Sequence, residues 1–351
     1  MTLQDRHANG HVSPASNGHG GHLDVRPSRS AHEAHEAIEE KLEHARAIVF
    51  RLEEALRAII LGQDEIVAGV VQAVVAGGHV LLEGAPGLGK TQIVRTLARL
   101  VAGSFARIQF TPDLMPSDVL GTTLVVTTPD GGKDLTYRPG PIFANLVLAD
   151  EINRATPKTQ SALLEAMAER TVSVEGKTLP LPAPFFVLAT ENPIETEGVY
   201  PLPEAQLDRF LVKLIVRMPS LETLALIGAR SEDPPPPSAL ASTEELLFAQ
   251  RVARTIPAAP HVEHYAAKLV VATHAHRAAR YGAGPRAVQA LMACARARAL
   301  AAGRSVVAIE DIAAVAPNVL RHRVGLRFEA EAEGATADIV VGQILATTGV
   351  G

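Results

Sequence analysis

Apolar positions along the first two thirds of the chain follow two kinds of pattern, which predict alternating helices and strands. Between residues 31 and 60, apolar side chains recur at alternating spacings of four and three, which indicates a helix. A second helical pattern covers 64–76. Short, mostly apolar runs predict buried strands at 80–82, 106–110, 145–149, 185–190 and 211–216. This alternation is typical of an α/β fold built on a parallel sheet.

The last third of the chain is predicted to be helical. Helical patterns lie at 221–233, 244–256, 261–280, 285–302, 309–323 and 337–347. Residues 1–30 are rich in Gly, Ser, His and Asn and offer almost nothing to bury, which predicts a disordered tail. We therefore expect a tail at 1–30, an α/β domain at 31–219 and a smaller helical domain at 220–351, with the prolines at 234–237 as a stiff linker.

Two hairpins are predicted to interrupt the α/β domain. Residues 122–126 can pair with 135–137 across a Pro-Asp-Gly-Gly turn. Residues 171–174 can pair with 178–179 across a turn that contains Lys177. The stretch 112–118 predicts a loop with acidic residues.

Composition and charge narrow the possible functions. The net charge of −5 means that the chain as a whole lacks the basic field of a nucleic-acid binder. A single cysteine, Cys294, excludes an internal disulfide framework and a cysteine-based zinc cluster. The first thirty residues contain no apolar signal sequence, and no apolar run approaches the length of a membrane span. These features predict a cytoplasmic protein.

A phosphate-binding loop is the strongest motif in the chain. The pattern G-x-x-x-x-G-K-[ST] is matched at every position by Gly84, Ala85, Pro86, Gly87, Leu88, Gly89, Lys90 and Thr91. Glycines let successive backbone N–H groups point at a phosphate, and the following helix adds its positive end. Lys90 then supplies a full charge to the β- and γ-phosphates, and the Thr91 hydroxyl can bind Mg²⁺. A predicted strand before the motif and a helix after it disfavour a chance glycine turn.

Polar side chains follow two of the predicted buried strands. Asp150 and Glu151 end the strand at 145–149, and Asn192 follows the strand at 185–190. The carboxyl ends of strands are where open α/β sheets bind ligands. Asp150 suits a role in holding Mg²⁺, Glu151 can polarise an attacking water and Asn192 can orient it. Alone, such residues are more often solvated loop starts or turn caps; the P-loop favours the functional interpretation.

These parts, in this order, closely resemble the MoxR family of AAA+ ATPases. The resemblance runs from about Ile38 to the end of the chain. It is carried by 84–91, 148–154, 189–192, 207–210, 284–287 and 315–323. The stretches 148–154 and 190–198, taken together, are much more specific for this family than any single motif is.

The resemblance implies a role for each matching residue. Lys90 and Thr91 match Walker A, Asp150 and Glu151 match Walker B, Asn192 matches sensor 1, Arg209 matches the arginine finger, Arg286 matches sensor 2, Gly62 and Gln63 match the stretch beside the adenine, and Gln109 matches a switch partner of Glu151. From composition alone, both arginines would be ordinary surface charges.

The resemblance also implies the assembly and its ligands. It predicts an αβα nucleotide domain, a helical lid, ATP and Mg²⁺ as ligands, and a ring, usually hexameric, with ATP at the subunit interfaces. MoxR-type ATPases are thought to remodel partner proteins, including during metal-cofactor insertion, and their partners often contain von Willebrand factor A domains. The client and the pathway stay open.

Two other function classes remain as alternatives. A nucleic-acid motor of the AAA+ class would need basic and aromatic residues on its hairpins, whereas 171–181 offers only Lys177 and 121–138 mixes Lys133 with Asp130 and Asp134. A small-molecule P-loop kinase would need an acceptor pocket, and no stretch of the sequence resembles one.

Overall fold

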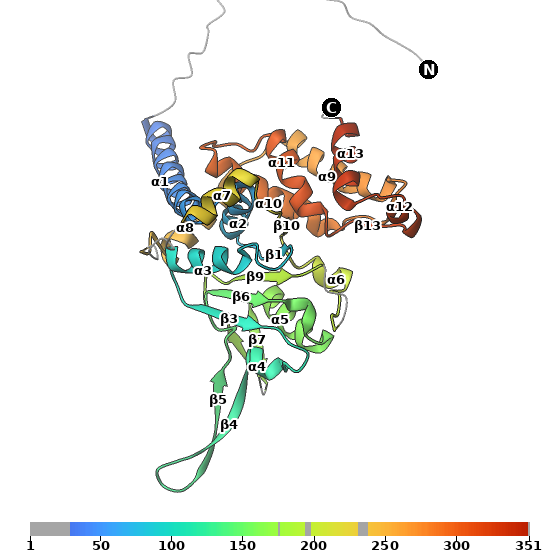
Figure 1. Ribbon diagram of the computed structural model, residues 1–351. Helices are drawn as coiled ribbons and strands as arrows, with labels where there is room; N and C mark the ends of the chain where they lie inside the picture. Colours follow the sequence, from blue (N-terminus) through green and yellow to red (C-terminus); the bar gives the residue numbers. More distant parts are fainter. Residues whose placement is uncertain (1–28, 175, 194–197, 231–237, 350–351) are drawn as a thin grey trace, which may run out of the picture. The chain divides into compact units, whose positions relative to one another are not determined.

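The fold is described from a computed structural model that covers residues 29–174, 176–193, 198–230 and 238–349 (Figure 1). Residues 1–28 of the predicted tail and the proline run at 234–237 lie outside the described residues. The chain from Glu40 onward forms one compact unit, which contains the whole sheet and the elements that follow it.

A five-stranded parallel sheet is the centre of this unit. Its strands are β1 (Val80–Glu83), β3 (Phe105–Gln109), β6 (Leu146–Asp150), β9 (Phe186–Glu191) and β10 (Val212–Ile215). Their order is β10-β1-β9-β6-β3, so β1 lies between two strands that come more than 100 residues later. All five residues of β6 are buried, which explains why four apolar residues in a row precede Asp150 in this strand.

Helices cover both faces of the sheet, which gives the predicted αβα layers (Figure 1). The helices of this region are α1 (Arg29–Ile59), α2 (Asp64–Ala76), α3 (Lys90–Leu100), α4 (Pro116–Leu120), α5 (Pro157–Glu169) and α6 (Glu204–Leu207), with a 3₁₀ turn at Ile152–Arg154. Alternate strand residues enter two cores. Val80 and Leu82 pack with α2 and α3, and Leu81 packs with α5.

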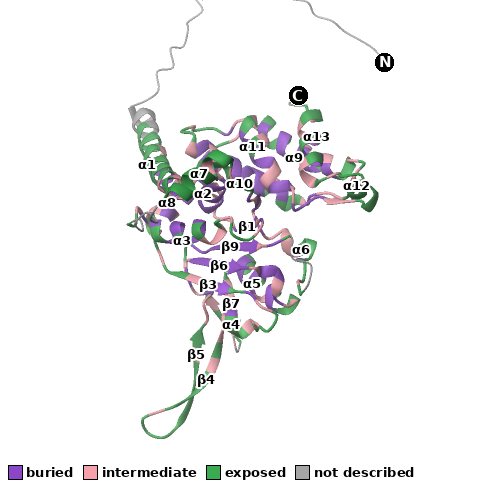
Figure 2. Ribbon diagram, in the orientation of Figure 1, coloured by how far each residue is buried: buried purple, intermediate pink, exposed green. Residues whose placement is uncertain are grey.

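The helical part that follows shares the first of these cores. It consists of α7 (Leu221–Ala229), α8 (Thr243–Thr255), α9 (Pro260–Ala275), α10 (Pro285–Ala301), α11 (Ile309–Leu320), α12 (Phe328–Ala332) and α13 (Ala337–Thr347). Helix α2 packs against both α8 and α10, and the buried residues run from the sheet into these helices without a break (Figure 2). In the described part of the chain, we find no helix with the length and apolar character needed to cross a membrane.

The structure corrects the predicted ends of three helices. The pattern at 221–233 runs past α7, which ends at Ala229, and residues 231–233 lie outside the described residues. The pattern at 261–280 predicts one helix, but α9 ends at Ala275, and β12 (Ala279–Tyr281) pairs with β13 (Gly325–Leu326). This pairing requires a glycine, because a Cβ at position 325 would lie 1.9 Å from the Tyr281 ring. The pattern at 309–323 also runs too far. Helix α11 ends at Leu320, and the next three residues turn back toward β10.

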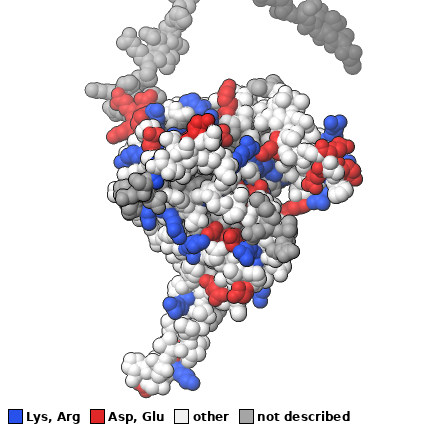
Figure 3. All heavy atoms as spheres, viewed as in Figure 1, with Lys and Arg blue, Asp and Glu red and all other residues white. Residues whose placement is uncertain are grey.

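Both predicted hairpins are present, and the longer one leaves the body of the domain. It consists of β4 (Gly121–Thr127) and β5 (Lys133–Pro139), whose residues are mostly exposed (Figures 1 and 2). Its exposed apolar side chains include Val125 and Leu135. The face of this hairpin seen in Figure 3 carries few charges. The shorter hairpin pairs β7 (Thr171–Val174) with β8 (Lys177–Pro180), and β2 (Val101–Ala102) pairs with β11 (Ala241–Ser242). The loop predicted at 112–118 contains the start of α4.

A buried histidine makes the stability of the sheet depend on pH. His79 lies just before β1; its Nδ1 accepts the Val187 N–H at 3.0 Å, and its Nε2 donates to the Met167 carbonyl at 3.2 Å. Burial lowers the pKa of His79 to about 4. The folded protein therefore keeps this ring neutral, while the unfolded chain protonates it below pH 6.5. Stability is lost as the pH falls from 6.5 toward 4.

We expect His79→Gln to reduce this dependence, because a glutamine amide supplies one acceptor and one donor but does not titrate. Between pH 7 and pH 5, the wild type should lose about 2 kcal/mol more unfolding free energy than the variant. Urea denaturation at both pH values measures the difference. Equal pH slopes for the two proteins would contradict the assignment.

Candidate nucleotide-binding site

The P-loop joins β1 to α3 and opens α3 at Lys90. Gly87 and Gly89 adopt left-handed φ angles of 81° and 79°, which favour glycine. Gly84 is restricted by space, because a Cβ there would lie 2.7 Å from the Val216 carbonyl oxygen. The Lys90 ammonium donates to the carbonyls of Gly84 and Glu191, the latter at 3.1 Å. The loop is thus shaped to present backbone N–H groups and one cation to an anion.

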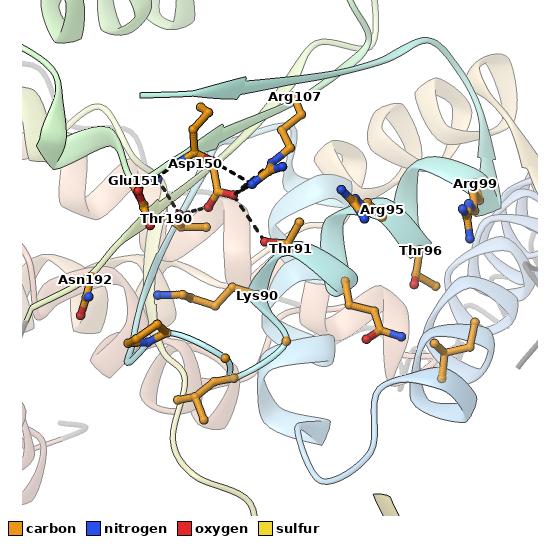
Figure 4. Close-up of a pocket in the computed structure, with 17 residues that line it drawn as sticks. Lys90, Thr91, Arg95, Thr96, Arg99, Arg107, Asp150, Glu151, Thr190 and Asn192 are labelled. Carbon is orange, nitrogen blue, oxygen red and sulfur yellow. Dashed lines mark hydrogen bonds and ion pairs between the residues drawn. The ribbon is translucent and has the colours of Figure 1, made fainter. Parts of the chain in front are cut away.

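One cavity of about 610 Å³ brings the central predicted residues together (Figure 4). Its wall includes Lys90, Thr91, Asp150, Glu151 and Asn192, together with the P-loop backbone from Pro86 to Gly89. Burial lowers the pKa of Lys90 from its usual value, and the nearby carboxylates oppose this shift. The sheet order accounts for the arrangement, because β1, β9 and β6 are neighbours and their carboxyl ends meet at this cavity.

Asp150 is buried and held by three side chains. The Thr190 hydroxyl donates to its Oδ1 at 2.6 Å, and Arg107 donates to its Oδ2 from Nε at 3.1 Å and from Nη2 at 2.7 Å. The Thr91 hydroxyl lies 3.5 Å from the same Oδ2. A hydroxyl and a carboxylate oxygen this close are suitable ligands for Mg²⁺. The residues therefore fit the cation that the P-loop implies.

Glu151 occupies a strained backbone position at the end of β6. Its φ of 57° and ψ of 50° are left-handed, which is unfavourable for a residue with a side chain. The Thr190 hydroxyl, which donates to Asp150, accepts the Glu151 N–H at 2.9 Å. Oε2 of Glu151 accepts from Gln109 Nε2 at 2.8 Å and from Arg154 Nη1 at 3.1 Å. The predicted contact between Gln109 and Glu151 is present; a switching role for it stays a prediction.

Arg107 connects the two carboxylates and was missed from the sequence. Its Nη2 also donates to Gln109 Oε1 at 2.7 Å, so a chain of hydrogen bonds runs from Asp150 through Arg107 and Gln109 to Glu151. The signal that could have found it is the strand period, which places 107 and 109 on one side of β3. The pairing of Gln109 with Asp150 in register completes the arrangement.

A second, more apolar cavity of about 450 Å³ adjoins the phosphate side. It shares Gly87, Leu88 and Gly89 with the first cavity. Its apolar wall is formed by Ile59, Ile60, Leu61, Leu88, Met218, Pro219, Leu224 and Ile227. Gln63 also lines it and donates to the Arg217 carbonyl at 2.7 Å. Gly62 lies next to Gln63, on the wall of a neighbouring cavity. The apolar wall suits a flat aromatic base.

The two predicted site arginines, Arg209 and Arg286, lie outside the phosphate cavity. Arg209 is half-buried, and its side chain makes no hydrogen bond or ion pair with the residues that the structure describes. Arg286 is the second residue of α10, is largely exposed and forms an ion pair with Asp208 Oδ2 at 3.7 Å. The structure thus brings Arg286 to the residue beside Arg209 and not to the P-loop.

The family comparisons agree with this arrangement. The family described as "ATPase family associated with various cellular activities (AAA)" matches residues 79–212, and "AAA lid domain" matches 271–344. "Chaperone MoxR1" of Mycobacterium tuberculosis is 44% identical over 91% of this chain and 87% of its own length. "Protein MoxR" of Methylorubrum extorquens is 33% identical over 79% and 87%.

A solved structure gives the same result. The crystal structure of a proposed ATPase from Cytophaga hutchinsonii superposes with a TM-score of 0.82 at 37% identity, covering 90% of this chain and 98% of that one. The P-loop, the paired carboxylates at the end of β6 and the helical part therefore have a common explanation. The chain belongs to the MoxR family of AAA+ ATPases.

Proposed function

We propose that the protein hydrolyses ATP to ADP and phosphate. The observation that carries this proposal is that β6 and β9 bring Glu151 and Asn192 to the cavity that holds Lys90. Lys90 and the P-loop N–H groups would bind the β- and γ-phosphates. Glu151 would polarise the attacking water, and Asn192 would orient it. In this role, Glu151 exchanges its contacts with Gln109 and Arg154 for the water.

Thr91 and Asp150 would hold Mg²⁺, which neutralises charge on the phosphate oxygens when it is bound. Arg107 also donates to the Asp150 oxygen that lies beside Thr91, which would orient that carboxylate toward the ion. The apolar cavity beside Gln63 would take the adenine. We assign the nucleotide domain to 31–219 and the lid to 220–351; the family matches at 79–212 and 271–344 support this division.

We further propose that the protein acts as a ring, hexameric as in its family, with Arg209 completing the site of the next subunit. The position of Arg209 supports this, because its side chain does not line the cavity of its own subunit. Arg286 would act as sensor 2 by exchanging Asp208 for the nucleotide when the lid moves. Rings of this kind place ATP where two subunits meet.

The work done by hydrolysis is proposed to be the remodelling of a protein client, including during cofactor insertion. The name of the mycobacterial relative, "Chaperone MoxR1", supports this class of function. The exposed apolar side chains on the β4–β5 hairpin suit contact with protein. A protein with a von Willebrand factor A domain is the proposed partner, and the cytoplasm is the proposed compartment.

Glu151→Gln tests the catalytic assignment. Glutamine keeps the size of the side chain and most of its hydrogen bonding but is not basic, so ATP should bind while turnover falls by roughly 10²-fold or more. Steady-state phosphate release and binding of a fluorescent ATP analogue measure the two effects. Glu165→Gln, an exposed position on α5, is the matched control. Normal hydrolysis by the Glu151 variant would show that another residue activates the water.

Glu151→Gln also tests whether the client is a protein or a nucleic acid. Held in its ATP state, Glu151→Gln should retain a protein client during affinity capture. ATPase rates measured with DNA, RNA and candidate proteins test the alternative of a nucleic-acid motor. Stimulation by nucleic acid alone would favour that alternative. The described hairpin residues argue against it, because β7 and β8 together carry a single basic residue, Lys177.

A further inference from the structure

Three consecutive residues after α11 attach the helical part of the protein to the segment that carries Arg209. Arg321 donates to the Lys213 carbonyl at 2.9 Å, and His322 Nε2 lies 3.2 Å from the Phe210 carbonyl oxygen. Arg323 reaches the same segment with both of its terminal nitrogens. This triplet lies in the part that matches AAA lid domains, whereas Phe210 lies in the part that matches the AAA ATPase family.

Arg323 makes the most contacts of the three. Its side chain is only 3% exposed, and its Nε donates to Asp208 Oδ1 at 2.8 Å. Nη2 donates to the Phe210 carbonyl at 2.6 Å and to the Asp208 carbonyl at 3.3 Å. Nη1 donates to the Leu211 carbonyl at 3.1 Å and to the Val319 carbonyl of α11. One planar guanidinium therefore fixes the carbonyls on both sides of Arg209.

The neighbouring groups support this arrangement. Asp208 is bound by two arginines from the lid, since Arg323 contacts Oδ1 and Arg286 lies 3.7 Å from Oδ2. Burial lowers the pKa of His322 well below its usual value, so the ring is neutral and donates a hydrogen bond to the Phe210 carbonyl from Nε2. The backbone around Arg209 is held from the lid, while the Arg209 side chain is left without a partner among the described residues.

We propose that Arg323 is a positioning residue for Arg209, so that the lid of one subunit sets where its finger meets the next subunit's ATP. The inference rests on the proposed action of Arg209 across a subunit interface. If a buried arginine contacted only helices of the lid, packing within the lid would explain it. Arg323 instead bonds to three backbone carbonyls of segment 208–211, and a finger displaced by about 1 Å can lose about 10²-fold in rate.

Mixing inactive variants tests this proposal. Arg323→Gln alone should bind ATP with unchanged affinity and hydrolyse it about 10²-fold more slowly, because its pocket is intact and its finger is misplaced. Mixed with Lys90→Ala, which has an empty pocket and an intact finger, it should recover activity. Mixed with Arg209→Ala, it should stay inactive, since neither subunit supplies a working finger. Arg323→Lys, which keeps the charge but loses the planar fork, should be intermediate.

The controls separate this inference from the proposed function. Arg296→Gln also removes a lid arginine that donates to a backbone carbonyl, that of Ile256, and should leave the ATPase rate unchanged. A mixture of Arg209→Ala with Lys90→Ala must recover activity; if it does not, the proposed ring fails, and this inference fails with it. If that mixture recovers activity, the proposed ring stands, and either of two results would still overturn the role of Arg323. The first is that a mixture of Arg323→Gln with Arg209→Ala recovers activity. The second is that both Arg323 variants bind ATP more weakly than the wild type.

Discussion

Lys90→Ala is expected to abolish nucleotide binding. Lys90 supplies the full positive charge of the phosphate-binding loop, and charge-assisted hydrogen bonds to phosphate are about twice as strong as neutral ones. In this structure its ammonium is held by the Gly84 and Glu191 carbonyls, so it already lies where the phosphates would bind. Titration with a fluorescent ATP analogue measures the loss.

The loss of binding is informative only if Lys90→Ala is still folded. Without nucleotide, Lys90→Ala should unfold at a temperature close to that of the wild type. ATP should raise the midpoint for the wild type only, because a ligand stabilises only a protein that binds it. Lys158→Ala, an exposed lysine on α5, should behave like the wild type. ATP affinity near the wild-type value in Lys90→Ala would refute the assignment of the pocket.

Arg209→Ala is expected to leave ATP affinity almost unchanged and to lower hydrolysis by roughly 10³-fold, as for known arginine fingers. The side chain contacts no part of its own cavity, so removing it should not disturb binding there. Its loss should instead weaken stabilisation of the transition state for hydrolysis in the adjacent subunit's site. ATP binding and turnover measured on the same preparation separate these two effects.

The mixing ratio makes this prediction quantitative. In a head-to-tail ring, each interface joins one pocket to one finger, so a random equal mixture of Arg209→Ala and Lys90→Ala should restore about a quarter of the interfaces. Activity should peak at equal amounts and vanish at either end, once subunit exchange has been verified. A finger acting within its own subunit, or a monomeric enzyme, would give no activity at any ratio.

The central parts of the site can be predicted from the sequence because each is a local pattern. The P-loop needs only its eight residues and the strand and helix beside them. Asp150, Glu151 and Asn192 follow buried strands, and parallel strands bring their carboxyl ends to one edge. The structure places these residues on one cavity, and their catalytic roles stay predictions.

The contacts that link distant segments could not be predicted in the same way. Arg107 matters because β3 pairs with β6 in a register that sets Gln109 against Asp150, and no local pattern determines that register. Arg323 was predicted to continue a helix, because a helical period does not show where a side chain finds carbonyls more than 100 residues away. The short strands β12 and β13 were missed for the same reason, since their pairing depends on Tyr281 lying over Gly325.

The strand order has a consequence for synthesis of the protein on the ribosome. In the described residues β1 pairs with β9 and β10, so the apolar Val80, Leu81 and Leu82 wait for these partner strands until about 100 further residues have been made. At bacterial and eukaryotic elongation rates, that delay is about 5–20 s. An unpaired apolar strand is prone to aggregate during this interval. We therefore expect the nascent chain to depend on holding chaperones until β10 emerges, however stable the finished sheet is.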